Sequence, residues 1–264
     1  MTSTSIKRST LNIVVPMAGR GSRFQQAGFT VPKPLIPIFG RPMTQVVIDN
    51  LRPYRRHRFI FIVQREIVLQ HGINRLLRQW APGCEIILLD GITEGAACTV
   101  LTAKSLIDDD NPMMIANCDQ YVDIDINDYL AHMDRSRADG QIMTMWADHP
   151  KWSYVRFGRD GAACEVVEKQ VVSNEATVGI YNYRRGRDFV VAAEAMMSKN
   201  LRVNDEFYVA PVYNEMLAAG SRVCLYNVGR EYDGMYGLGT PEDLAKFQEL
   251  AATRHIRSFI PLAA

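Results

Sequence analysis

The chain has 264 residues, of which 47% are apolar and 22% charged, and its formal net charge is +1. The apolar content excludes a largely disordered chain, and the balanced charge gives no electrostatic case for nucleic acid as a partner. Five cysteines without a C-x-x-C pair, a polar N-terminus and no apolar run near 18 residues lead us to expect a soluble, reduced, cytoplasmic protein without membrane contact.

Buried strands and amphipathic helices alternate in the first half of the chain. A β-branched apolar run over residues 11–15 predicts a buried strand. After it we expect a helix over 43–54, a buried strand over 58–63, a helix over 65–80, a buried strand over 84–89, a helix over 95–106 and a strand over 112–116. This order predicts an α/β, Rossmann-like fold with a mixed, mainly parallel central sheet and helices on both faces. Ligands of such sheets bind at the carboxyl ends of the strands.

Shorter strands follow in the second half. The pattern predicts strands over 142–147, 154–157, 164–169 and 176–183, helices over 186–198 and 206–219, a strand over 222–227 and a helix over 241–253. No linker rich in glycine or serine separates the two halves, about 11–140 and about 141–264. We therefore expect a single domain over residues 1–264.

The turn after the first strand has residues that suit an anion. Gly19 and Gly21 let backbone N–H groups approach a ligand, and Arg20, Arg23 and Lys33 place positive charge around them. Such a loop suits a polyphosphate. No further glycine completes a dinucleotide-binding G-x-G-x-x-G, and no Gly-Lys-Ser/Thr completes a P-loop. The alternative is an ordinary strand-to-helix turn with solvated arginines.

Residues 17–24, Met-Ala-Gly-Arg-Gly-Ser-Arg-Phe, and residues 33–37, Lys-Pro-Leu-Ile-Pro, resemble the nucleotide-binding signature of the sugar-1-phosphate nucleotidylyltransferases. The resemblance implies a nucleotide-diphospho-sugar transferase-like fold, of the compact type without C-terminal hexapeptide repeats. It also implies that the first half binds the nucleotide and the second half the acceptor. By position, the triphosphate would be held by Ala18, Gly19, Gly21 and Ser22, with Arg23 and Lys33 on its phosphates.

Asp119 follows the strand over 112–116, at the carboxyl edge where an α/β sheet binds ligands. A hard carboxylate there suits Mg²⁺, with phosphates supplying other oxygens. The alternative is that Asp119 caps the next turn. The resemblance favours the metal role, because the family has a similar Gly-Asp-Asn element; the glycine is missing here.

The segment 93–99 resembles the small-residue turn that packs beside the base in this family. Thr93, Gly95 and Ala96 would let a flat ring approach the backbone. The alternative is a packed helix start with Thr93 as its cap. The base-reading glutamine of the family is not evident, so the base remains open.

The acceptor side is expected around Glu168, Lys169 and Gly179. The resemblance implies that Lys169 grips the acceptor phosphate and that Glu168 orients the acceptor, although a Glu-Lys pair on its own is usually a solvated surface. Residues 204–208 have the polar character of a specificity loop, and the alternative is a simple helix start.

A second metal-binding aspartate is common in the family where this chain has Gly237. Asp233, four residues earlier, is a weak candidate for that role. Asp243 is expected to serve the start of the helix after Pro241.

These features together favour transfer of a nucleoside monophosphate from a nucleoside triphosphate to a sugar 1-phosphate or similar small phosphorylated acceptor, with release of pyrophosphate. Mg²⁺ is the expected cofactor, and Arg23, Lys33, Asp119 and Lys169 are the expected catalytic residues. The resemblance suggests precursors of capsule or lipopolysaccharide, and self-association. The alternatives are a cytidylyltransferase for a non-sugar phosphate such as phosphocholine, a non-catalytic nucleotide-binding regulatory protein, and a glycosyltransferase using Asp123-Ile-Asp125.

Overall fold

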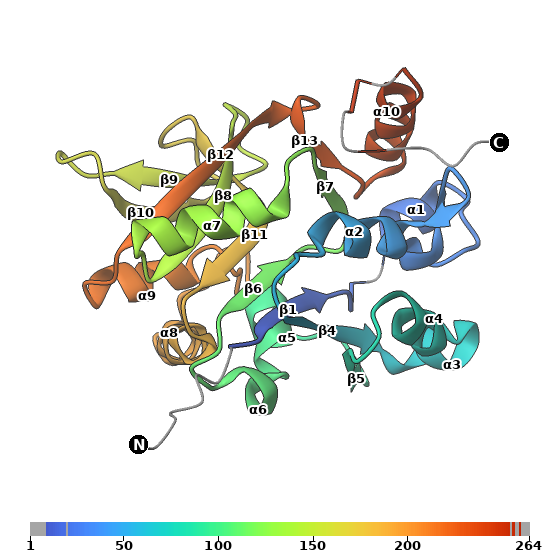
Figure 1. Ribbon diagram of the computed structural model, residues 1–264, viewed down its shortest axis with the longest axis horizontal. Coiled ribbons are helices and arrows are strands. Elements are labelled where there is room, and N and C mark those ends of the chain that lie inside the picture. The colour runs from blue at the N-terminus through green and yellow to red at the C-terminus, as the bar shows by residue number, and fades with distance from the viewer. Residues whose placement is uncertain (1–8, 20, 254, 257–258, 260–264) are drawn as a thin grey trace, which may run out of the picture.

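The computed structural model describes residues 9–19, 21–253, 255–256 and 259 (Figure 1). Its main sheet has the strand order β5-β4-β1-β6-β11-β8-β12-β13-β7. The first four strands in this order are parallel. They are β5 (Glu85–Leu89), β4 (His57–Gln64), β1 (Leu11–Pro16) and β6 (Met113–Ala116).

The sheet continues into the second half of the chain through β11 (Glu175–Tyr183), which is antiparallel to β6. Beyond it lie β8 (Gly140–Trp146), β12 (Val223–Glu231), β13 (Gly234–Gly237) and β7 (Gln120–Val122). A ribbon of β9 (Ser153–Phe157) and β10 (Ala163–Glu168) branches from β11. The mixed, mainly parallel α/β sheet expected from the sequence is confirmed.

Helices pack on both faces of the sheet (Figure 1). The side chains of strand β1 alternate between the two faces of the sheet. Ile13 and Val15 belong to one apolar core and Val14 belongs to the other, so both faces need a cover of helices. The first core includes residues of α2 (Met43–Leu51), α4 (Ile73–Trp80), α7 (Ile126–Ser136) and α10 (Pro241–Ala252). The second includes residues of α5 (Ala96–Leu101), α6 (Lys104–Ile107), α8 (Gly186–Ser198) and α9 (Val212–Ala218).

Several expected elements differ in the structure. The helix over 65–80 is two helices, α3 (Arg65–His71) and α4, because Gly72 has a left-handed backbone with φ 62°. The helix over 95–106 is likewise divided into α5 and α6. Strand β5 is only half-buried, because it is an edge strand. The helix expected over 206–219 begins only at Val212, after Pro211, and the preceding segment is a turn.

The sequence patterns did not predict the helix α7, the strands β7 and β13, or the small hairpin of β2 (Pro37–Ile38) and β3 (Arg41–Pro42). Asp125 begins α7 by accepting a hydrogen bond from the Asn127 N–H at 2.8 Å. That role gives Asp125 a structural purpose and removes support for a metal-binding Asp123-Ile-Asp125 element. All five cysteines are free thiols. Within the described ranges, no helix is both long and apolar enough to cross a bilayer.

Candidate active site

The glycine turn leads from β1 into the short helix α1 (Ser22–Gln26). Gly21 has φ 63°, and a Cβ built on it would lie 3.2 Å from Cβ of Lys33. A side chain here would be strained and would press on Lys33, so the position favours glycine for two reasons. Arg20 lies outside the described residues.

Lys33 begins the short 3₁₀ turn Lys33–Leu35 and donates a hydrogen bond from Nζ to Oδ2 of Asp119 at 2.5 Å. Their side chains are 18% and 27% exposed. Burial by itself would lower the pKa of Lys33, but the charge of Asp119 and the hydrogen bond outweigh it, so this pKa is raised. The ammonium is therefore held charged in a partly desolvated site.

Asp119 lies in the loop between β6 and β7, at the carboxyl end of β6 as expected. Its backbone C=O accepts a hydrogen bond from Leu238 N–H at 2.8 Å. A Cβ built on Gly239 would lie 2.9 Å from Oδ2 of Asp119, so Gly239 leaves room for that carboxylate. The segment after β13 thus packs against Asp119 although it is more than a hundred residues away in the chain.

The segment 93–97 forms another wall of the site. Gly95 has φ 133°, and a Cβ on it would lie 2.5 Å from the backbone N and O of Phe207. Phe207 N–H donates to Glu94 C=O at 2.8 Å, and Ala97 N–H donates to Phe207 C=O at 3.0 Å. Thr93 does not cap α5; its hydroxyl donates to Gly95 C=O at 2.9 Å. Glycine at position 95 is thus set by the close backbone of residue 207.

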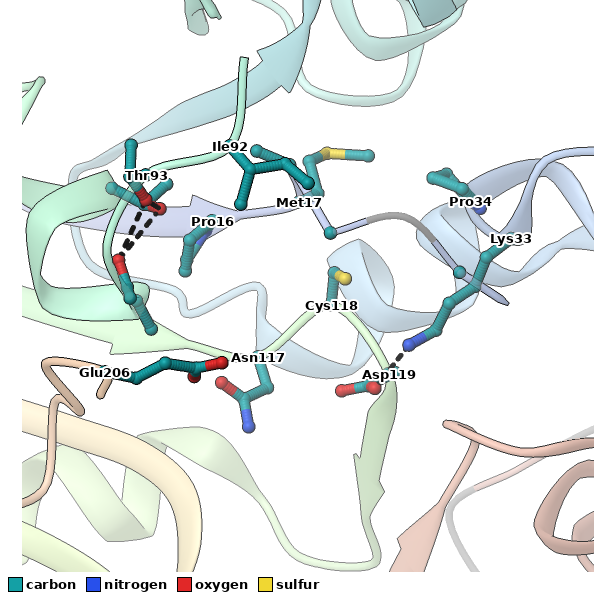
Figure 2. Close-up of a pocket in the computed structure, with 16 residues that line it drawn as sticks. Pro16, Met17, Lys33, Pro34, Ile92, Thr93, Asn117, Cys118, Asp119 and Glu206 are labelled. Carbon is teal, nitrogen blue, oxygen red and sulfur yellow. Dashed lines mark hydrogen bonds and ion pairs between the residues drawn. The ribbon is translucent and has the colours of Figure 1, made fainter. Parts of the chain in front are cut away.

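These walls enclose a cavity of about 370 Å³ (Figure 2). Figure 2 shows Lys33 and Asp119 meeting on one side of it and Glu206 entering from another element. Eight of the sequence-predicted site residues line this cavity: Ala18, Gly19, Gly21, Lys33, Thr93, Gly95, Ala96 and Asp119. A neighbouring hollow is also lined by Ala18, Gly19, Gly21 and Lys33, so the glycine turn and Lys33 border both.

Glu168 is the last residue of β10 and Lys169 follows it, and neither residue lines the cavity. The Nζ of Lys169 donates to the Tyr208 hydroxyl at 2.8 Å, and this hydrogen bond raises the pKa of Lys169. Glu168 accepts a hydrogen bond from the Ser153 hydroxyl, and burial raises the pKa of this carboxyl. Gly179, with φ 82°, leaves space that the side-chain amides of Asn117 and Gln120 occupy. Gly179 therefore borders Asn117, which lines the cavity.

Other expected residues lie less directly in the site. Ser22 and Arg23 are exposed on α1 and do not line the cavity, although the positive charge of Arg23 acts on Lys33. The structure does not bring Asp233 to Asp119. Gly237 pairs with Gln120 beside Asp119, whereas Gly234 lies opposite Asp123, so the exposed Asp233 is at the far end of β13.

The space beside Gly237 is occupied by Asp243. A Cβ on Gly237 would lie 3.2 Å from Oδ2 of Asp243. The Asp243 carboxylate accepts a hydrogen bond from the Tyr232 hydroxyl at 2.9 Å, and its N–H donates to the N-cap Thr240 hydroxyl at 3.1 Å. Asp243 therefore belongs to the first turn of α10, as expected.

A divalent ion would find few protein ligands here. Among the described residues, no group of three or more His, Cys, Asp or Glu side chains could hold a metal. Asp119 is a hard carboxylate in the same cavity as the glycine turn and Lys33. A single carboxylate of this kind fits Mg²⁺, which usually keeps several waters and takes further oxygens from substrate phosphates.

One residue that the sequence patterns missed, Gln64, and two from the expected specificity loop 204–208, Glu206 and Tyr208, complete the arrangement. Gln64, at the end of β4, donates from Nε2 to Ala18 C=O and to Gly91 C=O, both at 2.9 Å. It thus joins the glycine turn to the segment before residue 93. Glu206 lines the cavity and Tyr208 holds Lys169. Gln64 is the last residue of a strand, which is the one sequence signal that could have identified it.

The cavity at the carboxyl ends of β1 and β6 brings together a glycine turn, a lysine and an aspartate. The nucleotidyl transferase family model matches residues 13–245, and the chain therefore belongs to this family. The family assignment and the enzyme class, nucleotidyltransferase, are confirmed.

Relatives and solved structures agree with this family. The bifunctional protein GlmU of Burkholderia thailandensis is 25% identical over 253 residues, which are 91% of this chain and 52% of that protein. The chain thus spans about half the length of the curated relatives that it matches. The fold is similar to a nucleoside-diphosphate-sugar pyrophosphorylase from Vibrio cholerae RC9, with TM-score 0.75, 23% identity, and coverage of 90% of this chain and 99% of that chain. It is also similar to a UDP-glucose pyrophosphorylase complexed with UDP-glucose, with TM-score 0.73, 15% identity, and coverage of 93% and 99%.

Proposed function

We propose that this protein transfers a nucleoside monophosphate from a nucleoside triphosphate to a sugar 1-phosphate or similar small phosphorylated acceptor and releases pyrophosphate. The observation that carries the proposal is the Lys33–Asp119 ion pair, which faces the glycine turn across one cavity in a member of the nucleotidyl transferase family. A buried lysine and a metal-binding carboxylate are the two groups that a triphosphate needs there.

In this proposal the half 11–140 binds the nucleotide and the half 141–264 binds the acceptor. An acceptor phosphate oxygen attacks the α-phosphorus and forms a new P–O bond. The bond from the α-phosphorus to the bridging oxygen breaks, and its electron pair leaves with pyrophosphate. The chain contributes position and charge: Lys33 and Arg23 stabilise the departing pyrophosphate, and Lys169 holds the acceptor phosphate.

Lys33 must exchange partners for this to happen. Its ammonium is bound to Asp119, and phosphate oxygens of the nucleotide would take over that contact. Asp119 would then be released to hold Mg²⁺. Mg²⁺ bound there would neutralise negative charge on the phosphates.

The proposed setting is the cytoplasmic synthesis of activated precursors for capsule or other surface polysaccharide. A second candidate function is a non-catalytic nucleotide-binding regulator. It is favoured by Gly237, because the family commonly has a metal-binding aspartate at that position. The cavity that retains Lys33 and Asp119 supports the catalytic alternative more strongly.

The test is pyrophosphate release with Mg²⁺, using CTP, UTP, dTTP, GTP and ATP against a panel of sugar 1-phosphates and small phosphorylated alcohols. We expect release with one nucleotide and one acceptor class, and its loss in Asp119→Asn. Asp49→Asn is the matched control, since Asp49 forms only surface ion pairs with Arg41 and Arg52. Tight nucleotide binding without release for every pair would favour the regulator.

A further inference from the structure

Two walls of the cavity begin at the carboxyl ends of parallel strands that are separated by a third strand. Strand β4 lies between β5 and β1 in the sheet. Ala18 and Gly19 follow β1, and the segment 92–96 follows β5. Because residues of both segments line the cavity, the distance between the segments decides which ligand can touch both walls at once.

The backbone ladder between these strands stops just before the walls begin. Pairing of β1 with β4 ends at Pro16, and pairing of β5 with β4 ends at Leu89. The carbonyl groups of Ala18 and Gly91, each two residues further along the chain, lie beyond the last pairs of the ladder. Peptide carbonyls in this position take a hydrogen bond from a side chain or from water.

The side chain of Gln64 donates to both of these carbonyls. Gln64 is the last residue of β4, and its Nε2 lies 2.9 Å from the carbonyl oxygen of Ala18 and 2.9 Å from that of Gly91. An amide nitrogen has two hydrogens, so both are used and the amide is held in one orientation. One side chain therefore ties the start of one cavity wall to the start of the other.

Gln64 acts from behind these walls. It lines the neighbouring hollow and does not line the cavity, so a ligand in the cavity touches the walls and not Gln64 itself. In the proposed function, the phosphates of the nucleotide lie on the glycine turn and its base lies beside the segment 92–96. A nucleotide thus spans both walls, and its binding depends on their spacing, whereas a ligand held by one wall does not sense that spacing.

The chemistry of the contact requires an amide at this position. A leucine of similar size has no donor for either carbonyl. A carboxylate accepts hydrogen bonds and cannot donate them, so it would face two carbonyl oxygens with the same sign of partial charge. A protonated carboxyl group has one hydrogen and would restore one of the two hydrogen bonds.

We propose that Gln64 is a positioning residue that sets the distance between the phosphate wall and the base wall, so that the site prefers ligands carrying both groups at the spacing of a nucleotide. This inference rests on the proposed function for the placement of the base and the phosphates. The glycine turn also has hydrogen bonds that do not pass through Gln64, since the N–H groups of Phe24 and Gln25 donate to Gly21 C=O. The turn should therefore still bind phosphate groups alone when Gln64 is replaced.

The experiment measures binding by calorimetry with Mg²⁺ for wild type and Gln64→Leu. The probes are CTP, UTP, dTTP, GTP and ATP, and inorganic tripolyphosphate, which has the phosphates without a base. We expect Gln64→Leu to weaken every nucleotide that wild type binds by about fivefold to fiftyfold, and tripolyphosphate by less than about twofold. The matched control is Gln70→Leu, because Gln70 is exposed and donates to Glu66 within α3; it should leave both affinities unchanged.

Gln64→Glu gives a second readout, which does not depend on the folding of Gln64→Leu. Its carboxyl group donates no hydrogen bond when ionised and one when protonated. Nucleotide affinity relative to wild type at the same pH should therefore improve as the pH falls from about 7 to 5. A ratio that stays constant over this range would contradict the donor role of Gln64. Circular dichroism at each pH checks that the variant is folded.

Three results for Gln64→Leu would overturn the inference and leave the proposed transfer in place. Unchanged nucleotide affinity would remove the spacing role. Equal losses for nucleotides and tripolyphosphate would show damage to the glycine turn alone. A loss confined to one of several bound nucleotides would show that Gln64 reads the base.

The same titrations separate this inference from the proposed function. Wild type that binds nucleotide through both walls, with the expected loss in Gln64→Leu, but releases no pyrophosphate with any acceptor would refute the proposed transfer and keep the inference. Wild type that binds none of the five nucleotides would refute both.

Discussion

The cavity that contains Lys33 and Asp119 and the segment around Lys169, which are the proposed nucleotide and acceptor ends of the site, are built differently. At the nucleotide end, Lys33 and Asp119 are largely buried, in direct contact and held by glycines at positions 21 and 239. At the proposed acceptor end, Lys169 is exposed, does not line the cavity, and donates a hydrogen bond to the Tyr208 hydroxyl of another segment. If the proposed roles hold, the phosphate groups bind to a preorganised pair, whereas the acceptor is held by an exposed contact between two separate segments.

This comparison predicts the largest effect at the nucleotide end. Lys33→Ala removes the cation that is proposed to stabilise the departing pyrophosphate, and we expect kcat to fall about a hundredfold to a thousandfold. Steady-state kinetics with the active substrate pair measures it. Lys104→Ala, which breaks only a surface ion pair with Glu194, is the control. Near-normal turnover of Lys33→Ala, with an intact fold by circular dichroism, would refute the assigned role.

Gly95 lines the cavity and contacts the backbone of Phe207, the residue before Tyr208. This contact links the proposed nucleotide and acceptor ends. Gly95→Ala would place Cβ against the Phe207 backbone in a φ that alanine rarely adopts, so we expect a loss of about 3 kcal/mol in the free energy of unfolding. Urea denaturation measures the change. Gly83→Ala, at φ 78° with no atom within 4 Å, measures the cost of a milder positive φ without any collision. Equal losses in both variants would contradict the proposed clash.

A moderate effect is expected at the acceptor end. Tyr208→Phe keeps the ring, whose centroid lies 5.0 Å from Lys169 Nζ, and removes the hydroxyl. Because the contact is exposed to solvent, we expect the acceptor KM to rise only about threefold to tenfold, with nucleotide KM unchanged. Tyr208→Ala, which also loses the ring, should be worse. Equal kinetics of Tyr208→Phe and wild type would remove Tyr208 from the positioning role.

The smallest expected effect is on the pH dependence of the free energy of unfolding. Burial raises the pKa of Glu168 in the folded protein, so the folded state binds this proton more tightly than the unfolded chain. Its contribution to stability is present below the unfolded pKa and is lost as pH rises through the folded pKa. Glu168→Gln has no such proton, so the variant should gain stability relative to wild type as pH rises from about 4 to 7. A difference in unfolding free energy that stays constant over this range would contradict the assignment.

Short-range patterns account for what the sequence predicted well. The strands β1, β4 and β6 are apolar runs, and the turn at Gly21 and the Lys33 segment follow β1 in the chain, so the strand ends indicated residues that line the cavity. Asp119 was predicted for the same reason, because it follows a buried strand.

Long-range contacts account for what the sequence did not predict. The sequence left residues 204–208 open between a specificity loop and a helix start, and the backbone hydrogen bonds of Phe207 to residues 94 and 97 are what bring Glu206 to the cavity. Asp233 is close to Gly237 in the chain, but an extended strand separates the two in space. Strand β13 pairs with β7 across more than a hundred residues, a contact that periodicity does not contain.

The most direct test of the account labels the nucleoside triphosphate at its α-phosphate or at its γ-phosphate and identifies the product that carries each label. With the active substrate pair and Mg²⁺, label on the α-phosphate should appear in a nucleotide joined to the acceptor, and label on the γ-phosphate should appear in pyrophosphate. Both transfers should be lost in Asp119→Asn. Label in orthophosphate, or α-label that stays in free nucleoside monophosphate, would contradict transfer to an acceptor and with it the central claim.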